Sequence, residues 1–336
     1  MRRSALAFVA FLAAAPVAAQ EVAPATAPPL TVDAINAADL ATIPAQYVAT
    51  TDDDVAERQP DPAVVRLQVL LDRAGASPGV IDGFDGDNVR KAVVAFELML
   101  GVPTDGVLDP DIIAALETGD PVIGEYQVTQ DDVDAIGPDI PTDYAEMATR
   151  DFLGYTSLGE ELGERFHMTP DLLAAINPGA GFAAGDHVYV AAYGPDRTGE
   201  VARIEADKSL RQVRAYDAAG TLLVAYPATI GSEDNPSPSG SHIVEGVAPM
   251  PTYTYNPKVN FQQGDNTSVL TIPPGPNGPV GSMWIDLSEP TFGIHGTPEP
   301  SKIDKTGSHG CVRLTNWDAN ELAKMVKPGV PVDFVG

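Results

Sequence analysis

The chain has 336 residues, enough for two or three domains that each bury a core. Its formal net charge of −27 excludes proteins that bind nucleic acid or anionic lipid through charge. A single cysteine excludes an intramolecular disulfide.

The first 19 residues have the pattern of a secretory signal. Arg2 and Arg3 precede an apolar run over residues 5–15, and small residues follow at 17–19. The run is too short for a bilayer anchor, so we expect no stable membrane insertion after cleavage. No cysteine stands directly after the run, which argues against a lipid-modified N-terminal cysteine. Residues 1–19 are therefore predicted to be a cleaved signal peptide.

A helical domain is predicted to follow an acidic linker. Residues 20–60 carry seven acidic side chains against one basic one, with several prolines, and predict little fixed structure. Apolar residues then recur at helical spacing over 64–71 and 89–100, and 109–116 predicts a last helix. Asp-Gly pairs between these segments predict tight turns. Residues 61–118 are thus expected to form three short helices around a small core.

Residues 119–147 read as a second acidic, proline-bearing linker. After it, residues 148–192 predict a strand near Tyr155, two short helices and a closing strand over 186–190. His187 alternates with apolar neighbours and is interpreted as a surface residue of that strand. This segment is expected to be a compact βααβ module.

Residues 199–336 are predicted to be mainly β. Short strands are expected over 201–205, 213–216 and 222–230, separated by Gly/Pro turns, which favours a sandwich-like sheet. Residues 317–327 predict the one convincing helix of this region. The fold class is multidomain α+β.

An aromatic segment over residues 250–260 contains Tyr253 and Tyr255. It is either a loop packed on the sheet or a lid over a substrate cleft, since aromatic side chains at loop tips form good apolar walls. Under the second interpretation both tyrosines are candidate substrate-binding residues.

The strongest chemical signal lies between residues 295 and 314. Cys311 directly follows His309 and Gly310, and a second histidine-glycine pair, His295-Gly296, lies upstream. A cysteine attacks carbonyls as its thiolate, and a neighbouring imidazole is the usual means of removing its proton. The alternative is a buried, inert thiol, but the glycine-rich, polar surroundings of Cys311 do not fit a core strand. The pattern favours catalysis.

This stretch resembles the catalytic motif of L,D-transpeptidases. That motif is a histidine followed about a dozen residues later by Ser/Thr-His-Gly-Cys, and here it is met by His295, then Ser308, His309, Gly310 and Cys311. The resemblance covers most of residues 199–336. One departure is Ile303-Asp304-Lys305 in the loop before the motif, where Ile-Gly is common.

The resemblance implies a role for each motif residue. Cys311 would be the nucleophile and His295 its base, and the Gly296 carbonyl would orient the His295 ring. His309 would support the loop or the oxyanion, and Ser308 would hydrogen-bond within the loop.

Two further roles concern charge around the nucleophile. The backbone N–H groups of Gly310 and Cys311 are oxyanion-hole candidates. Arg313 is either an exposed charge after a strand or a cation that binds carboxylates of the substrate.

The two upstream domains resemble modules of cell-wall enzymes. Residues 61–118 are similar to the helical peptidoglycan-binding domain, through Leu67-Gln68, residues 82–86 and 101–106; Asn88 and Glu97 depart from its pattern. Residues 148–192 are similar to a LysM module that lacks the usual Gly-Asp-Thr loop. Each resemblance implies glycan binding. For residues 61–118 the alternative of a helical spacer that binds no ligand stays open.

For the whole chain the resemblance implies a periplasmic enzyme that acts on peptidoglycan stem peptides. Cys311 would attack the diaminopimelate carbonyl of a tetrapeptide stem, release D-alanine and pass the acyl group to an amine of a second stem. Water as acceptor would give a carboxypeptidase, and an outer-membrane lipoprotein would give an anchoring enzyme.

The sequence also bears on two other protein classes and on whether the protein holds a cofactor or a metal. A papain-like peptidase would carry its histidine after its cysteine, and none follows Cys311. A non-catalytic wall-binding protein would not need the Cys/His set. No cofactor is implied, and the histidine spacing indicates no metal site.

Overall fold

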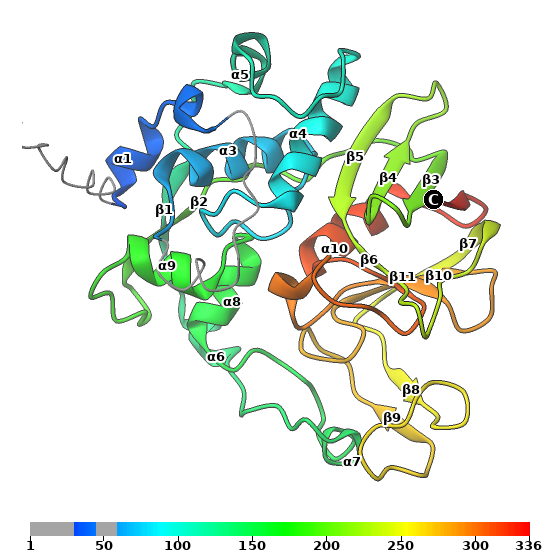
Figure 1. The fold of residues 1–336 in the computed structure, drawn as a ribbon. Coiled ribbons are helices and arrows are strands. Elements are labelled where there is room, and N and C mark those ends of the chain that lie inside the picture. The colour runs from blue at the N-terminus through cyan, green and yellow to red at the C-terminus, as the bar shows by residue number, and fades with distance from the viewer. Residues whose placement is uncertain (1–29, 45–58) are drawn as a thin grey trace, which may run out of the picture.

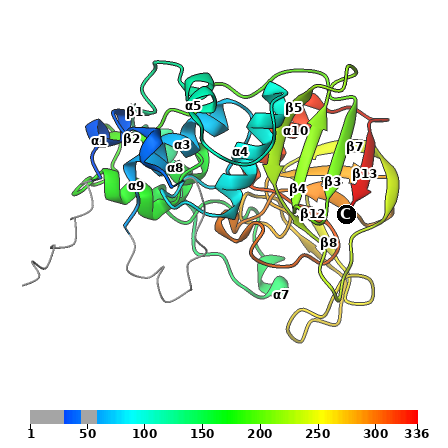
Figure 2. The same cartoon turned by 45° about the horizontal axis from the view of Figure 1, so that its top comes forward.

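The computed structural model describes residues 30–44 and 59–336, so the predicted signal peptide over 1–19 and much of the linker over 20–60 lie outside the described residues. A mostly helical body lies beside a β-rich body (Figure 1). One junction between them is the packing of helix α4 (Asp87–Leu100) against strand β5 (Leu222–Pro227) (Figure 2). In the described part of the chain, no helix combines the length and the apolar character needed to cross a bilayer.

Three helices of the first body lie where the apolar spacing predicts them. They are α3 (Pro62–Arg73), α4 (Asp87–Leu100) and α5 (Pro110–Leu116). Asp61 and Asp109 cap α3 and α5 by accepting backbone N–H hydrogen bonds, and a proline takes the first helical position of each. The three-helix prediction is confirmed.

Buried polar side chains fasten the turns between these helices. Gln68 Oε1 accepts hydrogen bonds from the N–H groups of Asp82 at 3.0 Å and Gly83 at 2.8 Å. Glu97, which departs from the family pattern, accepts a hydrogen bond from the Gly106 N–H at 2.9 Å. Gln68 and Glu97 accept hydrogen bonds from backbone N–H groups that would otherwise be buried without a partner. Both side chains therefore stabilise the turns between the helices.

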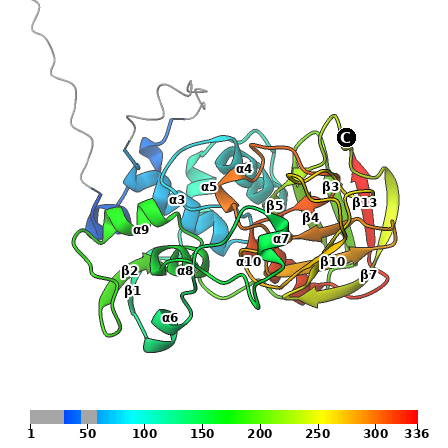
Figure 3. The same ribbon diagram turned by 90° about the horizontal axis from the view of Figure 1, so that it is seen from below.

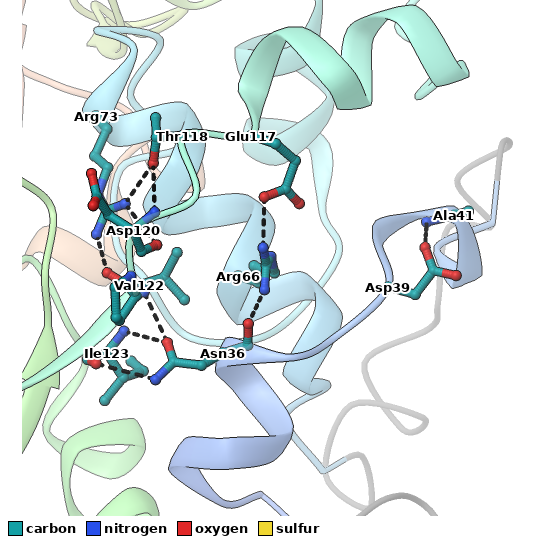
Figure 4. A network of polar contacts seen from close by, with 11 residues as sticks. Asn36, Asp39, Ala41, Arg66, Arg73, Glu117, Thr118, Asp120, Val122 and Ile123 are labelled. Carbon is teal, nitrogen blue, oxygen red and sulfur yellow. Dashed lines mark hydrogen bonds and ion pairs between the residues drawn. The ribbon is translucent and has the colours of Figure 1, made fainter.

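The low structure predicted for residues 20–60 is wrong for residues 30–44. This segment contains α1 (Val32–Asn36) and the 3-10 helix η1 (Leu40–Thr42), and it buries Ile35 and Leu40. Asn36 ties it to the body: its Oδ1 accepts from the N–H groups of Val122 and Ile123 at 2.8 and 2.9 Å (Figure 4). The composition misleads because two apolar side chains and one amide suffice to dock a short segment.

The predicted linker over 119–147 is also wrong in part. It contains β1 (Ile123–Gln127), which pairs antiparallel with β2 (His187–Ala191). Between them lie α6 (Gln130–Asp134), α7 (Tyr144–Met147), α8 (Leu158–Arg165) and α9 (Pro170–Ile176). The first strand of the module is therefore β1, and the strand predicted near Tyr155 is absent from its described backbone.

Residues 137–156, which we call the strap, leave this module between α6 and α8. Its ends are closed by a hydrogen bond from the Gly137 N–H to the Tyr155 carbonyl at 2.8 Å. The strap carries α7 away from the helical body to the hairpin of the β-rich body (Figures 1 and 3). A single buried cluster joins the segment at 30–44, the three helices and the module into one core.

The β-rich body is built on one nine-stranded sheet of order β5-β4-β3-β13-β7-β10-β11-β12-β6. Its central strand is β7 (Gly240–Pro249), whose first half pairs with β13 and whose second half pairs with β10. The other strands are β3 (Arg203–Asp207), β4 (Gln212–Tyr216), β5 (Leu222–Pro227), β6 (Thr229–Ile230), β10 (Met283–Leu287), β11 (Gly293–His295), β12 (Val312–Arg313) and β13 (Pro331–Val335). The prediction of a mainly-β region is confirmed. The strands form one continuous sheet, and its two halves share strand β7.

Helix α10 (Asn316–Met325) packs on this sheet, and residues of both halves and of the helix form one apolar cluster. A separate hairpin of β8 (Tyr253–Tyr255) and β9 (Leu270–Ile272) projects beside it. Because β8 begins within the aromatic segment, this segment is part of a projecting hairpin and not a loop on the sheet. We call residues 250–272 the lid hairpin.

Candidate active site

Two adjacent parallel strands bring the predicted nucleophile and base together. His295 ends β11, Cys311 directly precedes β12, and the register pairs Ile294 with Val312. Both side chains line one cavity of about 390 Å³. Parallel pairing therefore joins residues that the sequence separates by a long loop.

The His295 ring is held in one orientation. It is 5% exposed, it stacks on Trp284 with centroids 5.5 Å apart, and its Nδ1 lies 2.6 Å from the Gly296 carbonyl oxygen. A carbonyl oxygen only accepts, so Nδ1 carries the proton and Nε2 of the neutral ring is left as a base. The Gly296 carbonyl is thus in the orienting position that the sequence analysis assigns to it.

The charge state of both groups follows from burial. Burial, with a contribution from Arg313, lowers the pKa of His295 to about 4, although the carbonyls of Gly296 and Val280 oppose this shift. Burial raises the pKa of Cys311, against the backbone of Gly293 and the charge of Arg313. Both shifts favour the neutral forms near pH 7, a thiol at Cys311 and an imidazole at His295.

Ser308 organises the loop that presents the thiol. Its buried hydroxyl donates to the Cys311 carbonyl at 2.6 Å and accepts from the N–H groups of Gly231 at 2.8 Å and Gly310 at 3.3 Å. Gly310 has φ +105°, and a Cβ atom there would lie 2.6 Å from the Phe292 ring. Only glycine fits this position.

Ser237 is a site residue that the sequence analysis did not identify. Its buried hydroxyl donates to the Gly310 carbonyl at 2.6 Å. The Cys311 N–H belongs to the same peptide unit and points the opposite way in a trans peptide, so the Ser237 hydroxyl also orients an oxyanion-hole candidate. The polar turn around Ser237 was the available signal, but it shows no link to Gly310 in the linear sequence.

His309 contacts the lid hairpin. It is exposed and stacks on Phe261 with centroids 3.9 Å apart and an interplanar angle of 12°. In the described part of the chain no hydrogen bond joins it to Cys311. Its position suits loop support better than direct contact with the reacting thiol.

The two candidate tyrosines differ in position. Tyr253 lines the cavity. Tyr255 is 0% exposed, and its hydroxyl accepts a hydrogen bond from the Gln263 N–H at 3.0 Å. It packs inside the lid hairpin and does not line the cavity, so the assignment of Tyr255 to substrate binding is wrong.

Four other aromatic residues on the cavity wall come from outside the predicted motif: Tyr144, Phe261, Trp284 and Phe292. Trp284 lies on β10, and Tyr144 comes from the strap. Tyr144 packs edge-on against Tyr255 with centroids 5.2 Å apart, and also against Tyr253 and Phe261. No local signal marked Tyr144, because it lies in a stretch interpreted as a linker.

Arg313 lines the cavity, and its guanidinium is unpaired among the described residues. Among the described residues it has no hydrogen-bond or ion-pair partner, although Glu299 lies near enough to influence it. Burial lowers the pKa of Arg313. An Arg side chain at any accessible pH keeps its charge, so this cation is available to a carboxylate.

Asp304, a departure from the family pattern, anchors the catalytic loop to both bodies. Its carboxylate pairs with Lys91 of α4 at 2.5 Å and with Arg211 Nε at 2.8 Å. Its N–H donates to Thr229 Oγ1 at 2.9 Å. Asp304 therefore attaches the loop before the motif both to the helical body, through Lys91, and to the β-rich body, through Arg211.

Comparisons with known proteins match two regions of the chain. Residues 202–333 match the L,D-transpeptidase catalytic domain family, and residues 60–116 match a putative peptidoglycan binding domain.

Individual relatives carry related names. The putative L,D-transpeptidase YkuD of Bacillus licheniformis is 30% identical over 179 residues, which is 52% of this chain and 92% of that protein. The protein of the same name from Bacillus subtilis is 47% identical over 57 residues, 17% of this chain and 35% of its own length. A solved L,D-transpeptidase from Mycobacterium smegmatis aligns over 41% of this chain and 59% of its own, at 20% identity and a TM-score of 0.34.

Proposed function

The chain belongs to the L,D-transpeptidase family, and from this membership we propose that it is a peptidoglycan transpeptidase whose nucleophile is Cys311 and whose base is His295. The observation that carries the assignment is the hydrogen bond from His295 Nδ1 to the Gly296 carbonyl, at 2.6 Å. It leaves Nε2 as an unprotonated base in the cavity that also holds the thiol.

The first half-reaction is acylation. Cys311 Sγ attacks the diaminopimelate carbonyl of a tetrapeptide stem while its proton passes to His295 Nε2. The Cys311 N–H, oriented through Ser237, stabilises the oxyanion, and the Gly310 N–H contributes as far as its hydrogen bond to Ser308 allows. The carbon–nitrogen bond then breaks, the imidazolium protonates the leaving amine, and D-alanine departs.

The second half-reaction resolves the thioester. An amine of a second stem attacks the acyl carbon and gives a proton to His295, and the thiolate leaves and takes that proton back. Water in place of the amine gives a carboxypeptidase, and a lysine of an outer-membrane lipoprotein gives an anchoring enzyme. The cleft around the thioester selects the acceptor, because all three use the same chemistry.

Tyr253 is proposed to bind the donor stem, and Arg313 is proposed to bind a carboxylate of the peptidoglycan substrate. The unpaired Arg313 guanidinium suits a stem carboxylate, and Tyr253 offers an aromatic wall on the lid hairpin. His309 holds the nucleophile loop to that lid through Phe261.

The remaining proposals concern where the enzyme works. Residues 1–19 direct export, and the mature enzyme acts in the periplasm. The three helices over 61–118 and the module between β1 and β2, which we interpret as a LysM-like module, bind glycan and keep the catalytic body on its polymer. The match to a peptidoglycan binding domain supports the first of these modules.

Intact-mass spectrometry of residues 20–336 tests the chemistry. We expect a covalent carbapenem adduct on the wild type and none on Cys311→Ala, with a much slower adduct on His295→Gln. With a disaccharide-tetrapeptide we expect D-alanine release and a cross-linked dimer. Release without dimer would indicate carboxypeptidase or anchoring activity, and no adduct at all would leave a wall-binding protein.

A further inference from the structure

A second, larger pocket adjoins the cavity of the nucleophile. Its volume is about 620 Å³, and it shares Tyr144, Pro279 and Arg313 with the nucleophile cavity. One wall comes from the strap, including Asp139 and Met147, and the opposite wall comes from the catalytic body. The pocket therefore exists only where the helical body reaches the active site.

The strap is fastened to the lid hairpin by polar contacts. Gln263 Nε2 donates to the Thr142 carbonyl at 2.8 Å, and Gln263 Oε1 accepts from the Tyr144 N–H at 3.1 Å. Asn266 Nδ2 donates to Asp143 Oδ2 at 3.1 Å. Together with the packing of the Tyr144 ring, these contacts make α7 and the lid hairpin one unit.

The far end of the strap is fixed to the catalytic body as well. The Leu153 N–H donates to the Pro274 carbonyl at 2.8 Å, and the Leu153 carbonyl accepts from the Asn277 N–H at 3.0 Å. Gly275 has φ +147°, and a Cβ atom there would lie 2.1 Å from the Leu153 carbonyl oxygen. The two backbones approach too closely for any residue other than glycine at position 275. The end of the strap is therefore packed tightly against the catalytic body on this side of the pocket.

The charges that face the pocket fit a ligand with both an ammonium and a carboxylate. Arg313, unpaired among the described residues, lies at the junction with the nucleophile cavity. Asp139, Glu160 and Glu299 contribute carboxylates to the remaining lining. Glu160 accepts hydrogen bonds from Thr156 and Asn277, and Glu299 pairs with Lys302, so Asp139 is the carboxylate without a partner among the described residues. A carboxylate of the ligand would pair with Arg313, and an ammonium would be drawn by the acidic groups.

We propose that this pocket is the acceptor subsite, and that it receives the amino-acid end of a second stem peptide. The proposal rests on the proposed function, since it assigns the second substrate of the same reaction. Two peptides must meet at Cys311, and the donor occupies the cavity that contains the thiol. The adjoining pocket reaches that cavity at Arg313, two positions after Cys311 in the chain.

At this subsite the acceptor amine takes the acyl group from Cys311. The amine enters as an ammonium and releases one proton to water before attack. Its nitrogen forms a bond to the acyl carbon, the bond from that carbon to Cys311 Sγ breaks, and the second amine proton passes through His295 to the departing thiolate. The helical body thus takes part in acceptor choice through the strap.

The test separates acylation from transfer in residues 20–336. Met147→Trp fills the pocket, and Ala145→Trp adds the same bulk to an exposed position of α7 that does not line it. D-alanine release from a disaccharide-tetrapeptide reports acylation, and the ratio of transfer to hydrolysis is measured with D-methionine as the acceptor. We expect Met147→Trp to acylate within about twofold of wild type and to lower the ratio by about tenfold or more, as for a blocked binding site.

The controls and contrary outcomes are distinct from failure of the proposed function. Ala145→Trp should match the wild type in both steps. An unchanged transfer ratio in Met147→Trp, or an equal loss of acylation and transfer, would overturn the subsite. Absence of any thioester on the wild type would instead refute the proposed function.

A second variant keeps the test open should the tryptophan prevent folding. Asp139 is exposed and its side chain has no hydrogen-bond partner among the described residues, so Asp139→Lys should fold. Its positive charge should raise the half-saturating concentration of D-methionine several-fold without changing carbapenem acylation. An unchanged half-saturating concentration of D-methionine in Asp139→Lys would count against the subsite.

Discussion

Replacing Ser237 by alanine tests the orientation of the oxyanion hole. The Ser237 hydroxyl holds the Gly310 carbonyl at 2.6 Å, and the serine is 8% exposed, so the variant leaves a buried carbonyl without its partner. Loss of such a bond costs about 1–3 kcal/mol. If that cost falls on the transition state, acylation slows by about five- to 150-fold.

The assay is the rate at which a carbapenem forms its adduct under single-turnover conditions, with the free energy of unfolding in urea measured beside it. Ser239→Ala is the matched control, because Ser239 lies in the same turn and is exposed. The carbapenem carbonyl needs the same oxyanion stabilisation as a peptide carbonyl. Acylation at the wild-type rate in Ser237→Ala, with a lowered unfolding free energy, would refute the reasoning and leave Ser237 a purely structural residue.

Three further predictions concern titration and the junction between the bodies. The pKa of His295 falls from 6.5 to about 4, so the unfolded chain binds more protons in that window and acidification across it should cost on the order of 3 kcal/mol of stability. In urea titrations the His295→Gln variant should not show this acid-induced loss of unfolding free energy. A loss as large as in the wild type would contradict the assignment to His295. Burial instead raises the pKa of Glu164 from 4.5 to about 8, so the wild type should lose stability as pH rises through this range, while Glu164→Gln, which keeps an acceptor for Asn316, should not. Finally, Lys91→Ala and Asp304→Asn should be coupled by about 1 kcal/mol in a double-mutant cycle of unfolding, and additive effects would show that the pair does not link the bodies.

The helices of the first body could be predicted because their information is local. Apolar spacing, an aspartate cap and a proline at the first position act within a few residues, so α3 and α5 lie where the sequence places them. The motif around Cys311 is local in the same sense, and it made His295, Ser308 and Gly310 candidate site residues before any geometry was known.

The wrong predictions share one cause: the composition of a segment carries no information about the distant residues that it contacts after folding. The strand β1 looked like linker because its hydrogen bonds go to β2, far along the chain. Residues 30–44 looked unstructured because Asn36 satisfies backbone groups at 122 and 123. Tyr255 looked like a substrate contact because a sequence does not show which side of a lid an aromatic ring faces.

The sequence by itself indicated the chemistry of this protein: a cysteine, a histidine and a glycine-rich loop that together resemble the catalytic motif of L,D-transpeptidases. Only the tertiary structure decided how that chemistry is held and enclosed. Parallel pairing of β11 with β12 brings Cys311 and His295 to one cavity, Ser237 orients the loop, and the strap brings Tyr144 from the helical body. The physical reason is that reactivity resides in residue type and short spacing, whereas a binding site is made by surfaces that meet only after the chain has folded.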